Sequence, residues 1–320
     1  MSENKKNLRV VFMGTPEFSA TILASIRANG YNVIGVFTQP DKKVGRKQIL
    51  EKSPVKIVAE KDGIPVFTPS KLHPEAIEEL RKLQPDLIIL VAYGKILPQA
   101  VLDLPRLGAI NIHPSLLPKF RGPSPIQNAL LNGETTTGTT IMLMDAGIDT
   151  GDILRQRKTG VLPNETYLEL ADRLAGFSAE LLLETLDGFL AGKITPQKQN
   201  GVSASYCHLI KKTDGQIDWN DSAKNIHNRY RAFAAWPGIF TSWSTDGQSK
   251  RIQLKKINLT GDNPMDRRQP GEIFQHTNSI RVQTADGTIE LEEIQLEGKP
   301  AVRTVDFING YKNFIGSKLS

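Results

Sequence analysis

Three polar residues have the types and spacing that acyl transfer to an amine would need. Asn111 and His113 alternate with Ile110 and Ile112 at the end of a short apolar run. Residues i and i+2 of a strand point to the same side, so the amide and the imidazole are predicted to project together. Asp149 lies further along the chain, between two glycines.

The segment 145–152 is predicted to be the loop that brings Asp149 to this pair. It holds two glycines and three acids, a composition typical of a tight turn in which the backbone can approach a flat ligand closely. We therefore expect the Asp149 carboxylate to point into a pocket.

Together, these groups fit the formation of a tetrahedral intermediate. An Asn amide and a protonated His can both donate hydrogen bonds to its negatively charged oxygen. A neighbouring Asp stabilises the imidazolium and can accept a proton from the attacking amine. Ser115 lacks the Gly-x-Ser-x-Gly context of an activated serine, so no covalent nucleophile is predicted.

Each residue taken singly also has a structural interpretation. Asn111 fits a buried amide satisfied by backbone groups, His113 a structural histidine, and Asp149 an acid that turns the chain. Spacing by itself leaves both interpretations open. A metal site is not predicted, because the remaining histidines lack the spacing of metal ligands; they are His73, His208, His227 and His276.

Alternating strands and helices are predicted to position the three residues. Thr15 is expected to cap the first of these helices, with Pro16 in its first turn. Alternation of this kind predicts an α/β, Rossmann-like doubly wound sheet with its site at the carboxyl ends of the strands. The expected strands are 8–13, 32–37, 65–67, 86–91, 108–113, 139–144 and 152–156, and further helices are expected from Ser53, over 74–83 and over 164–190.

A second pattern begins after about residue 190. Short strands of period two are expected at 252–257, 271–274, 280–284 and 288–294. Asp286-Gly287 is a strong signal for a hairpin between the last two strands. Short strands with tight turns indicate a small β-barrel or open sandwich. We therefore predict a catalytic domain over 1–189, a basic linker over 190–208 and a β-barrel domain over 209–320.

Composition indicates a globular chain of two domains. The chain has 320 residues, of which 39% are hydrophobic and 23% charged. It has no apolar run long enough to span a membrane and no secretory signal at its N-terminus. Cys207 is the single cysteine, which excludes a disulfide framework and favours a reducing, cytoplasmic location.

The formal net charge is +6, and two basic segments contribute to it. Residues 38–56 hold six Lys or Arg against two acids, and residues 190–212 hold four Lys and no acid. Both are predicted to be loops. Such charge runs are usually solvated surface, and their alternative interpretation is neutralisation of RNA phosphates.

The motifs together resemble those of the folate-dependent formyltransferase family. The resemblance is carried by Asn111-Ile-His-Pro-Ser-Leu-Leu-Pro118, Arg121-Gly122, Pro125-Ile-Gln127 and Asp145-x-Gly-x-Asp-Thr-Gly151. Members of the family act on purine, sugar-nucleotide, folate or methionyl-tRNA substrates. Segments 12–19, 38–46, 93–98 and 231–238 resemble the methionyl-tRNA branch, and the likeness runs from about residue 8 to about 315.

This resemblance implies a complete set of roles. Asn111, His113 and Asp149 would be catalytic, 10-formyltetrahydrofolate would be the formyl donor, and no metal would be required. The acceptor would be the α-amino group of methionyl initiator tRNA. The folate pocket would be lined by Ser115, Leu116, Leu117, Pro118, Tyr93, Ile96, Leu97 and Asp145, and the tRNA would meet Lys42, Lys43, Arg46, Lys47, Lys211 and Lys212. An OB-like C-terminal barrel would add RNA surface, and no DNA, membrane or second copy of the chain is expected as a partner.

Three rival functions remain at this stage. A formyltransferase for a small amine, such as a sugar nucleotide, would share the three catalytic residues but would not need the basic segments. A non-catalytic RNA-binding relative would not need an intact Asn111, His113 and Asp149. An NAD-dependent enzyme is disfavoured, because the turn after the first strand, Met13-Gly-Thr-Pro-Glu, is not Gly-x-Gly-x-x-Gly.

Overall fold

The computed structural model describes residues 2–45, 48–245, 247–260 and 268–320. The chain divides into two compact units. The N-terminal unit comprises 1–125, 136–161 and 170–208, and the C-terminal unit comprises 126–135, 162–169 and 209–320. The residues predicted as a linker, 190–208, therefore fold with the N-terminal unit. Two short segments before residue 189 pack with the C-terminal unit, where the Arg231 guanidinium bonds the Leu162 and Glu165 carbonyls, each at 3.5 Å.

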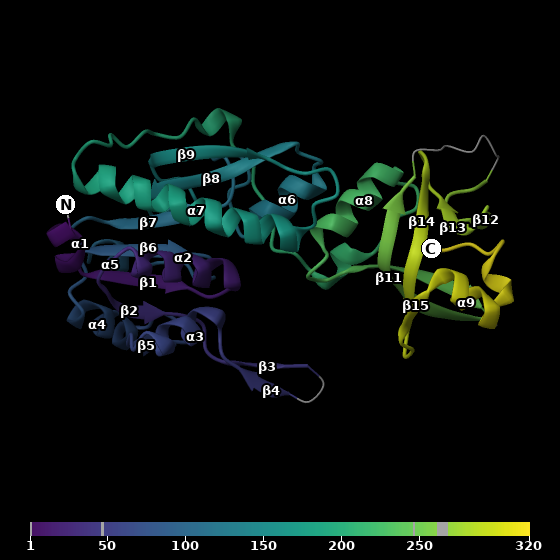
Figure 1. The fold of residues 1–320 in the computed structure, drawn as a ribbon, viewed down its shortest axis with the longest axis horizontal. Helices are drawn as coiled ribbons and strands as arrows, with labels where there is room; N and C mark the ends of the chain where they lie inside the picture. Colours follow the sequence, from purple (N-terminus) through teal and green to yellow (C-terminus); the bar gives the residue numbers. More distant parts are fainter. Residues whose placement is uncertain (1, 46–47, 246, 261–267) are drawn as a thin grey trace. The chain divides into compact units, whose positions relative to one another are not determined.

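A seven-stranded sheet organises the N-terminal unit (Figure 1), in the order β5-β2-β1-β6-β7-β8-β9. The first five strands in this order are parallel, whereas β8 runs antiparallel to β7 and β9 antiparallel to β8. The doubly wound layer predicted from the alternating pattern is confirmed. The strands are β1 Val10–Gly14, β2 Val33–Phe37, β5 Val66–Phe67, β6 Leu87–Val91, β7 Ala109–His113, β8 Thr136–Leu143 and β9 Ile153–Gly160.

Helices cover both faces of this sheet because its central strands are apolar on both sides. Val10 and Phe12 of β1 face one core cluster, to which α2 (Glu17–Ala28), α3 (Pro54–Lys61) and α7 (Tyr167–Leu190) contribute. Val11 and Met13 face the other, beneath α4 (Pro74–Lys82) and α5 (Gln99–Leu102). Each fully buried aliphatic side chain of this kind stabilises the fold by about 1.5–3 kcal/mol.

The start of α2 differs from the prediction. Thr15 is not its cap: the N-cap position is Pro16, and no side chain caps the helix. The Thr15 hydroxyl instead donates to the Tyr93 carbonyl at 3.3 Å, across the loops that follow β1 and β6. Ser53 does cap α3 as expected, accepting from the Lys56 amide at 3.1 Å.

Two further segments form short elements that the sequence analysis did not predict. The basic segment after β2 is a hairpin of β3 (Lys42–Val44) and β4 (Ile49–Glu51) rather than a loop throughout. It projects from the rest of its unit (Figure 1). The polar N-terminus forms a short helix, α1 (Ser2–Asn7). The sequence shows no alternation of apolar and polar residues in this hairpin, because the side chains from 49 to 51 are all exposed and none has to be buried.

The C-terminal unit is an antiparallel half-barrel sheet in the order β10-β11-β14-β13-β12, with β15 on β14. The Asp286-Gly287 turn joins β13 to β14 as predicted, with Gln283 paired to Thr288. Trp243 is fully buried and meets Phe314 edge-on, with ring centroids 5.1 Å apart. The elements are α8 Ala223–Ala232, β10 Ile239–Thr245, β11 Gln248–Leu259, β12 Ile273–His276, β13 Ser279–Gln283, β14 Thr288–Leu296, β15 Ala301–Arg303 and α9 Thr304–Gly310.

The remaining elements are short. They are α6 (Pro125–Leu131) and the 3-10 turns η1 (Gly201–Ser203), η2 (Lys212–Gly215) and η3 (Lys312–Phe314). Among the residues that the structure describes, no helix combines the length and the apolar character needed to cross a membrane.

Candidate active site

Strand β7 places Asn111 and His113 on the same side of the sheet. Ile110 and Ile112 point into one core, which leaves the two polar side chains on the opposite side. Asn111 is 6% exposed and His113 4% exposed. Buried polar groups of this kind need hydrogen-bond partners, and both find them in segments that are distant in sequence.

Asp149 lies between the two, as the sequence predicted. The Asn111 amide donates to Asp149 Oδ1 at 3.1 Å, and His113 Nδ1 is 3.6 Å from Asp149 Oδ2. The carboxylate also accepts from the Gly122 backbone N–H, at 2.7 Å to Oδ2. One carboxylate therefore meets the amide, the imidazole and a backbone amide, at the edge of the sheet where parallel strands end.

The second nitrogen of the imidazole is also occupied. His113 Nε2 lies 2.9 Å from the Phe120 carbonyl oxygen. A carbonyl only accepts, so Nε2 carries a proton in this arrangement. Nδ1 carries a second proton only in the imidazolium, whose charge would then face Asp149. A substrate oxygen that takes a hydrogen bond from Nε2 must share it with Phe120 or displace Phe120.

Two glycines allow this close packing. Gly122 has φ +112, and a Cβ there would lie 2.6 Å from the Cys207 carbonyl oxygen. A Cβ on Gly151 would lie 1.8 Å from the Leu143 carbonyl oxygen. Asp149, between them in the site, itself has φ +52, a conformation that costs a non-glycine residue roughly 1–3 kcal/mol. Such strain persists only where surrounding contacts hold the backbone.

Sequence reasoning missed several residues that hold the site together. The Phe120 carbonyl and the Gly122 amide are backbone groups, which no side-chain pattern reveals. Arg121, between them, was noted only as part of a motif, yet it is buried at 5% exposure. Gln199 lies in the predicted linker without any signal and bonds the Arg121 guanidinium and the loop of Asp149.

The residues predicted to hold folate follow the ends of the strands β6, β7 and β8. The loop after β6 carries Tyr93 and Leu97, both buried, and Ile96, which is 82% exposed. The Tyr93 hydroxyl is buried and has no hydrogen-bond partner among the described residues, and burial raises the pKa of Tyr93 to about 12. An orphaned phenol of this kind is a group that a polar ligand edge could satisfy.

The segments after β7 and β8 contribute both buried and exposed residues to this region. Leu116 and Pro118 are half-buried, whereas Leu117 is buried. The Ser115 hydroxyl donates to the Lys119 carbonyl at 2.6 Å, so it shapes the turn. Asp145 is exposed and accepts from Gly147 N and Thr150 Oγ1. These bonds assign Asp145 a role in shaping its loop.

The basic residues predicted to bind tRNA are distributed over both units. Lys42 and Lys43 are exposed on β3, and Lys211 and Lys212 are exposed near η2. Arg46 and Lys47 lie outside the described residues. Of the other two cations in the segment, Lys56 pairs with Asp41 at 2.8 Å and Lys52 pairs with Glu60 at 2.7 Å. Among the residues that the structure describes, Lys42 and Lys43 form no ion pair.

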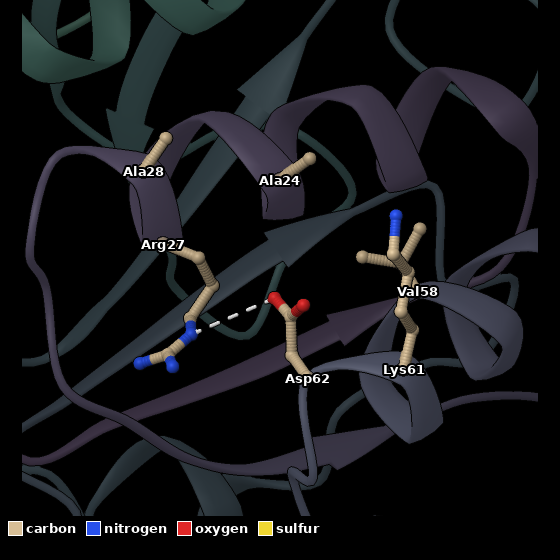
Figure 2. Close-up of a pocket in the computed structure, with 6 residues that line it drawn as sticks. All are labelled: Ala24, Arg27, Ala28, Val58, Lys61 and Asp62. Carbon is tan, nitrogen blue, oxygen red and sulfur yellow. Dashed lines mark ion pairs between the residues drawn. The ribbon is translucent and has the colours of Figure 1, made fainter.

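Two hollows elsewhere in the molecule are lined by none of the predicted site residues. One of about 460 Å³ lies between α2 and α3 (Figure 2), where the Arg27 and Asp62 side chains point toward each other at 3.8 Å. Lys61 also lines this hollow. Another, of about 590 Å³, lies within the C-terminal unit and is lined by residues that include His227, Tyr230 and Arg281. Within the described part of the chain, no cluster of His, Cys, Asp or Glu is arranged to hold a metal ion.

Comparison with known proteins extends over nearly the whole chain. A family model described as formyl transferase matches residues 7–186. A second model, formyl transferase C-terminal domain, matches residues 209–312.

Curated relatives are similar at high coverage. The methionyl-tRNA formyltransferase of Geobacter sulfurreducens is 43% identical over 314 residues, which is 98% of this chain and 96% of that protein. That of Caldicellulosiruptor saccharolyticus is 44% identical over 315 residues, covering 97% and 99%. Among solved structures, the N-formyltransferase from Helicobacter canadensis, in complex with folinic acid and dTDP-3-aminofucose, aligns with a TM-score of 0.65. It is 21% identical and covers 89% of this chain and 98% of that one, a likeness that supports the fold.

Proposed function

This chain belongs to the formyl transferase family, and from that premise we propose that it transfers a formyl group to the α-amino group of methionyl-tRNA. The product would be formylmethionyl-tRNA, the form of initiator tRNA that begins translation, which would place the reaction in the cytoplasm. The substrate rests on the full-length similarity to methionyl-tRNA formyltransferases at 43–44% identity. A sugar-nucleotide substrate is disfavoured, because the relatives that match nearly the whole chain at 43–44% identity are methionyl-tRNA formyltransferases.

The observation that carries the chemistry is the position of the Asp149 carboxylate. It touches the Asn111 amide at 3.1 Å and faces the His113 imidazole at 3.6 Å. A base and two hydrogen-bond donors thus converge at one strand end. This arrangement suits an amine that must lose a proton as it attacks a carbonyl carbon whose oxygen becomes negative.

The roles of the three residues follow from this geometry. The Asn111 amide uses one hydrogen on Asp149 Oδ1, and its second hydrogen stabilises the developing oxyanion. The His113 imidazolium stabilises the oxyanion by its positive charge. Its Nε2–H, which meets the Phe120 carbonyl in this structure, would donate to the substrate oxygen instead. Asp149 accepts the proton that the attacking nitrogen loses, directly or through one water. When the oxyanion reforms its carbonyl, the bond to the departing nitrogen breaks, and that nitrogen takes up the proton that Asp149 had accepted, directly or through one water.

The formyl donor that fits this site is 10-formyltetrahydrofolate, whose N10 would be the departing nitrogen. Its ring would lie against the loops after β6 and β7. Ile96 offers exposed apolar surface there, and the Tyr93 hydroxyl is an unsatisfied buried group. Ser115 and Leu117 would support the pocket from beneath, because both are buried.

The exposed lysines support an RNA substrate. Lys42 and Lys43 on the hairpin, and Lys211 and Lys212 near η2, are suited to phosphates of a bound tRNA. Arg46 and Lys47, which the sequence also assigns to tRNA binding, lie outside the described residues. The half-barrel sheet of the C-terminal unit would add RNA surface. The enzyme would act as a monomer, with no metal and no DNA partner.

A formyl-transfer assay tests the proposal. The purified chain is mixed with 10-formyltetrahydrofolate and methionyl-tRNA, with uncharged tRNA, free methionine and an amino-sugar nucleotide as alternative acceptors. The proposal expects formylation of the charged tRNA alone. Transfer to the sugar nucleotide but not to methionyl-tRNA would overturn it.

A further inference from the structure

Gln199 occupies an unusual position for a residue in a segment predicted to be a linker. Its side-chain oxygen accepts from Arg121 Nε at 3.1 Å and Nη2 at 2.8 Å. Its side-chain nitrogen donates to the Asp149 carbonyl at 2.9 Å and to the Gly151 carbonyl at 2.8 Å. A primary amide has two hydrogens and two acceptor directions, so all four are used by one buried cation and one loop.

The loop end of this contact is the catalytic loop. Asp149 has φ +52, and the two carbonyls that Gln199 holds belong to the Asp149-Thr150 and Gly151-Asp152 peptide bonds. Buried carbonyls need partners, and a strained residue keeps its conformation only if the surroundings hold it. Asn111 and Gly122 hold the carboxylate of Asp149. Gln199 holds its backbone.

The other end of the contact is the segment 120–122. Arg121 is buried, and its guanidinium also donates to the Tyr206 hydroxyl at 3.2 Å. The residues on either side carry the Phe120 carbonyl, which meets His113, and the Gly122 amide, which meets Asp149. Gln199 therefore connects the two backbone segments that orient the base and the imidazole.

The rest of the segment fixes Gln199 in place. The Gln197 backbone pairs with Ile153 in both directions, at 2.8 and 2.9 Å. Further along, Arg121 N donates to the Ser205 carbonyl at 2.9 Å and Cys207 N donates to the Arg121 carbonyl at 2.8 Å. The chain is thus hydrogen-bonded to β9 before Gln199 and to the segment 120–122 after it. These contacts limit how far the Gln199 amide can move.

From these contacts we propose that Gln199 is a positioning residue, whose amide sets the place of Asp149 by bonding the loop backbone and Arg121 together. It touches no reacting atom. It acts because a displacement of about 1 Å in a catalytic group can lower turnover roughly 10²-fold. The effect on turnover rests on the proposed function, which makes Asp149 catalytic. The holding of the loop backbone by Gln199 does not depend on that function.

The test is Gln199→Glu, which keeps the shape and changes the hydrogen bonding. A carboxylate still accepts from Arg121, with added charge, so the contact with the segment 120–122 is kept. It donates nothing to the two carbonyls of the loop and repels them instead. We expect kcat to fall about 10- to 100-fold, KM for both substrates to change less than about threefold, and the thermal midpoint to stay within a few degrees.

Gln197→Glu is the matched control, because it introduces the same change two residues away, where the contacts of the segment are made by the backbone. It should keep the activity of the wild type. Gln199→Asn, which retains the amide on a shorter stem, should recover part of the lost turnover. A Gln199→Glu protein with wild-type kcat would overturn the proposal, as would one whose activity loss simply follows a loss of folded protein.

Hydrogen exchange separates failure of this proposal from failure of the proposed function. Backbone amides of residues 145–151 should exchange faster in Gln199→Glu than in the wild type and in Gln197→Glu, whatever the substrate of the enzyme. If the wild-type protein formylates nothing, the proposed function fails, and faster loop exchange still supports Gln199 as the residue that holds the loop. Unchanged exchange with unchanged kinetics refutes the positioning role alone.

Discussion

Replacing Asn111 by alanine tests the proposed role of its side-chain amide as a hydrogen-bond donor to the oxyanion. The side chain is 6% exposed and has one hydrogen bond to Asp149, at 3.1 Å. Alanine removes the donor proposed to face the oxyanion. Loss of one such donor costs about 2.7–4 kcal/mol in the transition state, so kcat should fall about 10²- to 10³-fold.

The same change also affects the ground state, and the two effects can be separated. A hydrogen bond to a charged acceptor contributes about 1.5–3 kcal/mol to stability. Because proteins of this kind have free energies of unfolding of about 5–15 kcal/mol, the variant is expected to remain folded at the assay temperature. Single-turnover rates at saturating methionyl-tRNA and folate, with urea unfolding in parallel, report the two quantities independently.

A control and a charged variant complete the test. Asn132→Ala removes an exposed amide that donates to the Asn128 carbonyl, and it should leave kcat unchanged. Asn111→Asp places a second carboxylate next to Asp149 and should be at least as inactive as the alanine variant, because like charges that close repel. A normal single-turnover rate for Asn111→Ala would refute the oxyanion role.

Three further predictions concern the segment 120–122, the hairpin and the C-terminal unit. In Gly122→Ala, the new Cβ would clash with the Cys207 carbonyl at a backbone φ of +112. The change should lower the free energy of unfolding by roughly 2–5 kcal/mol and abolish formyl transfer. Unfolding curves and kcat measure both effects, and wild-type stability would contradict the prediction. Lys42→Ala with Lys43→Ala should raise KM for tRNA and reduce the slope of log KM against log salt by up to about 1.5, while KM for folate stays constant; an unchanged slope argues against phosphate contacts on β3. Burial and then the charge of Arg231 lower the pKa of His227 to about 4, below its ordinary value of about 6.5. Protonation therefore favours the unfolded state, and stability should fall as pH drops from about 6.5 toward 4; His227→Gln should flatten that limb of the stability curve, and an unaltered limb would show that other groups cause it.

Much of the fold follows from local pattern. Apolar runs such as Asp86–Val91 predict buried parallel strands, and the turn at Asp286-Gly287 predicts its hairpin. Ser53 before Pro54 predicts the start of α3. Thr15 shows the limit of such rules, because its hydroxyl is drawn to the Tyr93 carbonyl, 78 residues away, and the cap is lost. A search for alternating buried residues likewise cannot find the hairpin that begins at Lys42, because Lys42, Lys43 and residues 49–51 are all exposed.

The site divides in the same way. Alternation along β7 determines that Asn111 and His113 share a side, because successive strand residues point in opposite directions. The glycines around Asp149 predict a tight loop. What the sequence could not determine is which backbone groups meet these side chains. Gly122 reaches Asp149 across 27 residues, and Gln199 reaches it across 50. Those contacts depend on how the segments after β7 and α7 fold back over one strand end, and only the tertiary structure brings them within hydrogen-bonding distance.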